Sequence, residues 1–250
     1  MARFETLTLR VTDPDAQRQF YCDALGMSDQ GDGRFGYSPH ETALKFVKAS
    51  TAYAPHPSDL YWKIALSVPN IDLAYAQLLH LGVRCNTPGQ FRDVGYLAKF
   101  QDPEGFTIEL IDHWFQGERP EGSVDDTHLG GGAHLSLITL RTGDINAVEP
   151  EILNWGARPL SIQPVNPFGF TLYFYAFTDE TLPNRKDLCA VENRVWTYRR
   201  PYTVLEIQHV HEMANEVQVD KNSGGYVGLT IGSTKQLLHS ERLKISSKVQ

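Results

Sequence analysis

Two side chains that could bind a metal ion stand in strand-like runs of the second half of the chain. His134 lies near the start of the run 133–141, and Glu206 lies in the run 203–207. Because side chains alternate between the two faces of a strand, Glu206 shares a face with Gln208. Imidazole and carboxylate groups suit Zn, Fe, Mn or Ni, and a catalytic site needs about three protein ligands. The sequence therefore offers two candidate ligands and leaves the third open.

Basic side chains suggest a second kind of chemistry, the binding of an anion. Lys45 and Lys63 lie in two strand-like runs, and Arg10 stands at the end of the first strand of the chain. An ammonium group repels a metal ion, whereas a guanidinium group can hold a carboxylate through two parallel hydrogen bonds. The alternative reading is structural: the lysines belong to ion pairs, and the arginine is an ordinary surface residue.

A dense aromatic run covers residues 173–177. If this run is a strand, alternate members face opposite sides. Tyr173 and Tyr175 are therefore candidates for the wall of a ligand pocket, and packing in the core is the alternative.

Charge and composition exclude several classes of partner. The 23 Lys and Arg residues against 30 Asp and Glu give a net charge of −7, and no basic cluster marks a nucleic-acid surface. No apolar run approaches 18 residues, and the first residues lack the apolar segment of a signal peptide. The three cysteines form no CxxC pair, which suits free thiols in a reducing compartment. We expect a cytoplasmic protein that acts on a small molecule, without a nucleic-acid or membrane partner.

The elements that must position these residues are repeated along the chain. Segments starting at residues 4, 62, 133 and 226 each begin with an alternating strand, and the first three continue into a capped helix. The helix N-cap candidates are Asp13, Asn70 and Asp144, and the C-terminal glycines are Gly26, Gly82 and Gly156. Further strand-like runs follow each helix. The repeating unit is thus βαβββ, present three times, and a fourth unit stops after one helix-like stretch.

Loops divide the repeats. Residues 117–132 are polar and rich in Gly and Pro, so we expect them to link a first half, 1–116, to a second half, 133–250. The loop 179–193 is long for a hairpin connection and is a candidate lid or dimer contact.

The tandem units resemble the vicinal oxygen chelate superfamily, which contains glyoxalases, bleomycin-resistance proteins and extradiol dioxygenases. The likeness rests on the repeat, on Phe20-Tyr21 before Leu25-Gly26-Met27, and above all on the sequence Asp-Pro-Glu-Gly-Phe-Thr-Ile-Glu-Leu at 102–110. The resemblance implies an α+β fold in which two units pair into a cup-shaped mixed sheet with helices outside. It also implies a divalent metal in the cup, bound by residues of each unit's first and last strands.

In the first two units these ligand positions fall on Thr6, Lys45, Lys63 and Glu109. Of these four, Glu109 alone could bind a metal ion. The resemblance therefore predicts that residues 1–116 form a metal-free cup in which Glu109 pairs with the two lysines. A pocket for an anion is the alternative.

In the third unit the ligand positions fall on His134 and Glu206, which the resemblance predicts to bind Fe, Mn, Zn or Ni in the second half of the chain. Glu206 itself or a nearby tyrosine, with Tyr226 as the candidate, could act as the catalytic base. The fourth unit places Tyr226 at its ligand position. The candidates for a third ligand are Tyr226, Gln208, His209, His211 or a residue of a second subunit.

The resemblance leaves two functions open. The first is a metal-dependent lyase, isomerase or ring-cleaving dioxygenase that acts on a small substrate with adjacent oxygens. The second is a metal-free protein that binds or sequesters a small molecule. The shortened fourth unit further suggests a homodimer that completes the cup.

Overall fold

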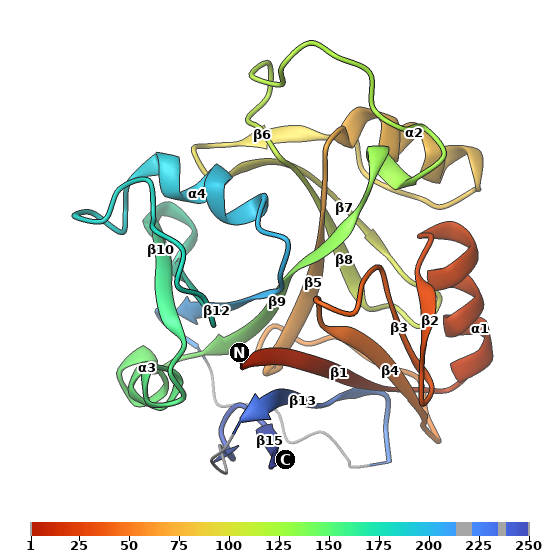
Figure 1. The fold of residues 1–250 in the computed structure, drawn as a ribbon. Helices are drawn as coiled ribbons and strands as arrows, with labels where there is room; N and C mark the ends of the chain where they lie inside the picture. Colours follow the sequence, from red (N-terminus) through yellow and green to blue (C-terminus); the bar gives the residue numbers. More distant parts are fainter. Residues whose placement is uncertain (1, 214–221, 235–238, 250) are drawn as a thin grey trace.

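The computed structural model describes residues 2–213, 222–234 and 239–249. These residues form two curved mixed sheets with α1, α2 and α3 packed on their outer sides (Figure 1). The predicted α+β architecture of tandem βαβββ units is confirmed.

The bounds of the elements are as follows. The larger sheet contains, in spatial order, β10 (Arg158–Val165), β11 (Phe170–Ala176), β12 (Val204–Val210), β9 (His134–Thr142), β5 (Tyr61–Val68), β8 (Thr107–Asp112), β7 (Gly95–Gln101) and β6 (Gly89–Phe91). The smaller sheet contains β14 (His239–Ser240), β15 (Ile245–Val249), β13 (Gly225–Thr234), β1 (Arg3–Val11), β4 (Ala43–Lys48), β3 (Arg34–Gly36) and β2 (Ser28–Gly31). The α-helices are α1 (Pro14–Gln19), α2 (Ile71–His80), α3 (Ile145–Asn154) and α4 (Val191–Tyr198).

Each helix of the first three units starts where the sequence predicts. The side chains of Asp13, Asn70 and Asp144 accept hydrogen bonds from main-chain N–H groups of the first helical turn. The α1 helix is short and continues as a π-helical turn over Phe20–Ala24.

The pairing of the units differs from the expected one. β1 pairs antiparallel with β13, and β5 pairs antiparallel with β9. The first unit therefore joins the fourth, and the second joins the third, so that neither 1–116 nor 133–250 forms a cup by itself. The physical reason is burial: β5 and β9 are buried on both faces, which places them at the centre of one sheet.

The fourth unit is more complete than its sequence suggests. In all four units the opening strand lies parallel to the last strand, as in the pairs β1–β4, β5–β8, β9–β12 and β13–β15. The strand β15 thus supplies the last strand that the fourth unit was expected to lack. The helix-like stretch expected before it includes residues 235–238, which lie outside the described residues.

The segment 117–132, expected as a linker, ends in a 3-10 turn over Leu129–Gly131 that packs on the larger sheet. Gly130 has a φ of 58°, and a Cβ atom at this position would lie 2.7 Å from the Cβ of Val68. Only glycine allows the main chain to approach β5 this closely.

The turn 102–105 ties the second unit to the first. The side chain of Asp102 accepts hydrogen bonds from Gln17 Nε2 at 2.7 Å and from Tyr21 Oη at 3.0 Å. Two residues further on, Glu104 accepts a hydrogen bond from the Thr12 main-chain N–H at 2.9 Å. The acidic residues of the turn 102–105 therefore hold the β7–β8 hairpin against the first helix.

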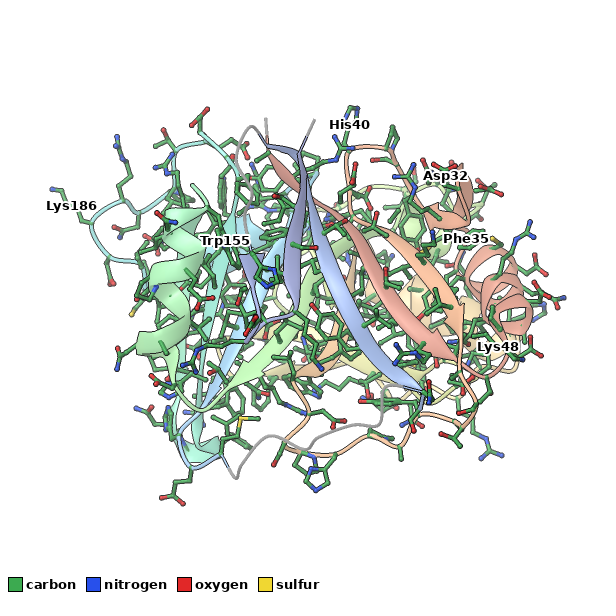
Figure 2. All side chains as sticks on the ribbon, turned by 90° about the horizontal axis from the view of Figure 1, so that it is seen from below. Asp32, Phe35, His40, Lys48, Trp155 and Lys186 are labelled. Carbon is green, nitrogen blue, oxygen red and sulfur yellow. The ribbon has the colours of Figure 1, made fainter. Side chains whose placement is uncertain are left out.

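The main core lies between the two sheets and their helices. It contains Leu7 and Leu9 of β1 together with Ile64 and Leu66 of β5, all inaccessible to solvent. The other face of β5, which carries Lys63 and Ala65, looks into the hollow of the larger sheet. The free face of the smaller sheet is seen in Figure 2, where none of the described helices covers its strands.

Candidate functional site

A buried lysine occupies the centre of the larger sheet. Lys63 Nζ lies 2.8 Å from Glu109 Oε2 and 3.2 Å from Glu206 Oε2. The three side chains are 2%, 6% and 2% exposed. One ammonium group therefore stands between two carboxylates in a place that water hardly reaches.

Two further contacts complete this group, which we call the Lys63 cluster (Lys63, Glu109, Glu206, Thr139 and Lys99). Thr139 Oγ1 donates a hydrogen bond to Glu206 Oε2 at 2.9 Å, and Lys99 Nζ lies 3.3 Å from Glu109 Oε1. Lys99 is 40% exposed, so it connects the buried group to solvent.

The opposite charges of the cluster stabilise the ionised forms of Lys63 and Glu109. Burial alone would lower the pKa of Lys63, but the carboxylates of Glu109 and Glu206 raise this pKa above its ordinary value. Burial alone would raise the pKa of Glu109, but the ammonium groups of Lys63 and Lys99 lower it. Lys63 and Glu109 are therefore both charged at neutral pH.

Strand register shows which positions of the two units correspond. Glu109 pairs with Ala65, two residues after Lys63, and Glu206 pairs with Thr139, two residues after Leu137. Leu137 is thus the counterpart of Lys63 in the third unit.

His134 lies three residues before that position, so it does not occupy the ligand position assigned to it from the sequence. One of these three positions comes from an irregularity in the pairing of β9 with β5, where the register shifts by one residue next to Leu135. His134 is paired with Ser67 instead, while Glu206 lies beside Thr139. The structure therefore does not bring His134 and Glu206 together.

The residues at the expected metal position do not suit a divalent ion. The four corresponding positions hold Lys63, Glu109, Leu137 and Glu206, which are two carboxylates, one cation and one apolar side chain. The ammonium group already neutralises the carboxylates, and a divalent ion beside it would be repelled. In the described part of the chain, no group of three or more His, Cys, Asp or Glu side chains could hold a metal ion.

An aromatic ring with three cations marks the mouth of the larger sheet's hollow. The ring centre of Trp62 lies 4.9 Å from Lys63 Nζ, 4.9 Å from Lys99 Nζ and 4.8 Å from Arg141 Cζ. Arg141 also donates a hydrogen bond from Nε to Gln208 Oε1 at 2.8 Å. The three cations stand against the two carboxylates of the cluster and against Asp59, whose charge acts on Arg141, so the charges of this region balance.

The rest of the hollow is filled by the third unit's own insertion. The loop 179–193 leads into α4, which lies in front of the larger sheet between β10 and β6 (Figure 1). Tyr198 at the end of α4 is 2% exposed, and its hydroxyl donates a hydrogen bond to the Val94 carbonyl at 2.9 Å. Arg194 forms an ion pair with Asp93 at 2.7 Å. The helix α4 thus bridges the second and third units.

The two predicted pocket tyrosines lie on the outer face of the sheet instead. Tyr173 pairs with Ile207, whereas Phe174 pairs with Glu206 and shares its face. The Tyr175 hydroxyl donates a hydrogen bond to Glu149 of α3 at 2.7 Å. The aromatic side chains alternate as predicted, but Phe174 faces the hollow, whereas Tyr173 and Tyr175 face outward.

The remaining predicted residues belong to the smaller sheet. Tyr226 stacks on Tyr61 with ring centres 5.8 Å apart, and its hydroxyl donates a hydrogen bond to the Leu243 carbonyl. Lys45 pairs with Thr8, and Arg10 lies two residues further along the same strand as Thr8. Arg10 and Lys45 therefore share one face, away from Lys63.

One part of the expected pairing of Glu109 is correct, and one part is not. Lys63 pairs with Glu109 as predicted, whereas the second cation is Lys99 rather than Lys45. Lys99 stands directly opposite Glu109 in the β7–β8 hairpin. Counting outward from the turn at Asp102 would have found this pair from the sequence.

In the residues that the structure describes, no helix has the length and apolar character needed to cross a membrane. The cytoplasmic location stays a prediction.

Comparisons with known proteins give the following matches. Residues 3–110 match the family model described as Glyoxalase/Bleomycin resistance protein/Dioxygenase superfamily. The structure is similar to that of glyoxalase I from Zea mays, with a TM-score of 0.61 and 18% identity over 93% of this chain and 74% of that chain. It is also similar to a putative dioxygenase from Bacillus subtilis, with a TM-score of 0.57 and 15% identity over 92% of this chain and 70% of that one. At these identities the similarity concerns the fold alone. No curated protein matches the sequence.

Proposed function

We propose that this chain, whose residues 3–110 match the Glyoxalase/Bleomycin resistance protein/Dioxygenase superfamily, binds a small anionic molecule without a metal ion in the larger cup. The observation that carries the proposal is the position of Lys63 between Glu109 and Glu206. The ammonium group of Lys63 occupies the place where members of the superfamily would bind a metal ion. A metal-dependent lyase, isomerase or dioxygenase would need ligands that these positions lack.

The proposed ligand binds at the mouth of the cup. Trp62 offers an aromatic surface, and Lys99 and Arg141 offer charged hydrogen-bond donors beside it. These two donors are cationic, so the ligand would be an anion, and a planar ring would stack on the indole. Tyr198 fills the deeper part of the hollow, which restricts the ligand to this outer region.

Lys63 contributes to binding without contacting the ligand. Its side chain is 2% exposed and fully engaged by the two carboxylates. By neutralising part of their charge, it leaves the positive charges of Lys99 and Arg141 less compensated, which favours an anion. The proposed role of Lys63 is therefore electrostatic, and the groups that touch the ligand are at the mouth.

Calorimetric titration with a panel of aromatic and aliphatic carboxylates, in buffer containing EDTA, tests this function. We expect saturable binding of an aromatic carboxylate by the wild type, and a loss of at least tenfold in affinity for Lys99→Gln and for Arg141→Gln. The matched control is Lys45→Gln in the smaller sheet, which should bind as the wild type does. Binding or turnover that requires an added divalent metal would refute the proposal and restore the metal-dependent enzyme.

The predicted homodimer stays a prediction. Each of the four units pairs with another unit of the same chain, so a second subunit is not needed to complete either sheet. Light scattering over a range of protein concentrations would decide between a monomer and a dimer.

A further inference from the structure

The opening strands of the two sheets correspond position by position. In the larger sheet Lys63 of β5 pairs with Thr139 of β9, and in the smaller sheet Thr6 of β1 pairs with Thr230 of β13. In both pairings the register shifts just before this position, and it shifts again after the residue two further along. Thr6 therefore stands in the smaller sheet where Lys63 stands in the larger one.

The same comparison extends to the last strands of the units. Lys45 takes the place of Glu109, because each pairs with the residue two positions further along the opening strand. Ser246 takes the place of Glu206, because each pairs with the threonine of its own opening strand. The two carboxylates of the larger sheet are thus replaced by an ammonium group and a hydroxyl group. Carboxylates accept hydrogen bonds, whereas their replacements can donate them.

Two of the side chains in the smaller sheet lack a partner. Thr6 is 4% exposed, and its Oγ1 atom is buried without a hydrogen-bond partner. Lys45 is half-buried and forms no ion pair with any residue that the structure describes. Buried polar groups are rarely left unpaired, so a hydroxyl and an ammonium group on adjacent strands point to a ligand that accepts hydrogen bonds from both.

The neighbours of Lys45 on its own face add positive charge. Lys45 pairs with Thr8 on one side and with Arg34 on the other, and Arg10 lies two residues beyond Thr8. The side chains that alternate with these along the strands belong to the main core, so the four share the opposite face. Like charges directly opposite each other on adjacent strands are unfavourable, and an anion between them would relieve the repulsion.

The acidic side chains around this face are engaged elsewhere. Glu5 lies 3.9 Å from Arg3, and Asp32 lies 3.7 Å from Arg34. Glu41 accepts a main-chain hydrogen bond from β9 at 2.8 Å. In the described part of the chain, none of these carboxylates forms an ion pair with the ammonium group of Lys45, which is therefore available to an external anion.

Hydroxyl groups lead from the buried part of this face to solvent. Thr6, Thr230 and Ser246 pair with one another in a row across β1, β13 and β15. Thr6 is buried, Thr230 is half-buried and Ser246 is exposed. Thr230 Oγ1 lies 3.5 Å from the Thr6 carbonyl oxygen, a distance too long for a strong hydrogen bond. The hydroxyl of Thr230 can therefore turn to a ligand beside Thr6.

We propose that the smaller sheet binds one phosphate group at this place, which we call the Lys45 site (Lys45, Arg34, Thr6, Thr8 and Thr230). An ammonium group and separate hydroxyl groups donate single hydrogen bonds in different directions, which suits the tetrahedral oxygens of a phosphate. Planar carboxylates are matched better by the parallel N–H groups of a guanidinium. The phosphate group belongs either to the free inorganic ion or to a small phosphate monoester.

This proposal does not depend on the proposed function. The Lys45 site lies in the smaller sheet, and its five residues include no aromatic ring on which an aromatic carboxylate could stack. Lys45→Gln should therefore weaken phosphate binding and leave carboxylate binding at the mouth of the larger cup unchanged. Lys99→Gln should do the reverse. Each proposal can fail while the other stands.

Calorimetric titrations with inorganic phosphate and with glycerol phosphate, each in HEPES buffer containing EDTA, test the site. We expect about one phosphate group per chain for the wild type, and about tenfold weaker binding by Lys45→Gln, because a charged hydrogen bond is lost. The matched control, Lys99→Gln, should bind phosphate as the wild type does. Tighter binding of glycerol phosphate than of inorganic phosphate would support a monoester as the ligand, and the opposite order would support the free ion.

A change at Thr6 separates binding from folding. Thr6→Val removes a buried hydroxyl that has no partner within the protein, so the stability in urea without phosphate should not fall. Phosphate binding by this variant should weaken about fivefold. Binding equal to that of the wild type would overturn the proposal. So would the absence of saturable binding at millimolar phosphate, or equal losses in Lys45→Gln and Lys99→Gln, which would mean that phosphate acts only by screening charge.

Discussion

The two sheets are built from the same repeat, yet they differ in where they place a lysine: one sheet buries it in ion pairs, and the other leaves it partly exposed. In the larger sheet, Lys63 is buried between two carboxylates. In the smaller sheet, Lys45 is half-buried and forms no ion pair with any residue that the structure describes. The same residue type is thus part of the interior in one sheet and of the surface in the other. The comparison teaches that the fold alone does not decide what a position does; the partners on neighbouring strands do.

Removing the charge of each lysine in turn tests whether the two sheets depend on these residues differently. Lys63→Met leaves two buried carboxylates without their shared cation, and should cost about 3–5 kcal/mol of stability at pH 7. Urea denaturation measures this loss, and it should shrink in acid as the carboxylates become protonated. Millimolar Mn²⁺ or Zn²⁺ should restore part of the stability of this variant.

Lys45→Met is the control, with an expected change within about 0.5 kcal/mol. Equal stability of the two variants would mean that Lys63 is not the cation on which the larger sheet depends.

The filling of the larger hollow can be tested next. Tyr198→Ala should destabilise the protein by about 3 kcal/mol, because it leaves a cavity and unpairs the Val94 carbonyl. Tyr198→Phe keeps the ring and should cost about 1 kcal/mol. Both changes are measured by thermal denaturation. A larger aromatic carboxylate that binds Tyr198→Ala but not the wild type would show that the ring limits the depth of the cup.

A buried carboxylate between the two sheets gives a pH-dependent prediction. Glu41 accepts a hydrogen bond from the Leu135 N–H at 2.8 Å, and burial raises its pKa to about 7 from an ordinary 4.5. Its contribution to stability is therefore most favourable below pH 4.5, and is lost as the pH rises through about 7.

Glu41→Gln removes this ionisation while keeping an acceptor oxygen. At pH 8 the variant should be more stable than the wild type by about 2 kcal/mol. The difference should disappear near pH 4, as measured by urea denaturation at both pH values. A constant difference at all pH values would show that Glu41 does not titrate in this range.

The smallest expected effect concerns the threonines of the two opening strands. Thr139→Val removes the hydrogen bond to Glu206 and should cost about 1.5 kcal/mol, since a buried carboxylate loses a donor. Thr8→Val on the open face should change stability by less than about 0.5 kcal/mol. Denaturant midpoints of the two variants give the comparison. Similar losses would indicate that the threonines contribute through β-strand propensity alone.

Much of the fold follows from local signals. The helix caps at Asp13, Asn70 and Asp144 and the alternating strands predict the repeated unit, because these features depend on neighbouring residues. The Lys63–Glu109 pair follows because both residues belong to one unit.

The remainder depends on long-range register, which local patterns do not contain. Alternation separates Tyr173 from Phe174, but only the pairing of β11 with β12 shows which of them faces Glu206. His134 is misassigned because β9 begins three residues before Leu137 and contains a one-residue shift of register, neither of which local patterns show. Nothing in the first unit indicates that its opening strand will pair with the fourth unit.

The pairing of β1 with β13 also limits the order in which the strands can pair during synthesis. During synthesis from the N-terminus, β1 emerges more than 200 residues before its neighbour β13. Until then one edge of β1 has no strand to pair with, and an unpaired edge invites association with other chains. The hydrogen bonds of Asp102 and Glu104 to the first helix can form much earlier. They would hold the N-terminal unit against the growing larger sheet until the last strands arrive to complete the smaller one.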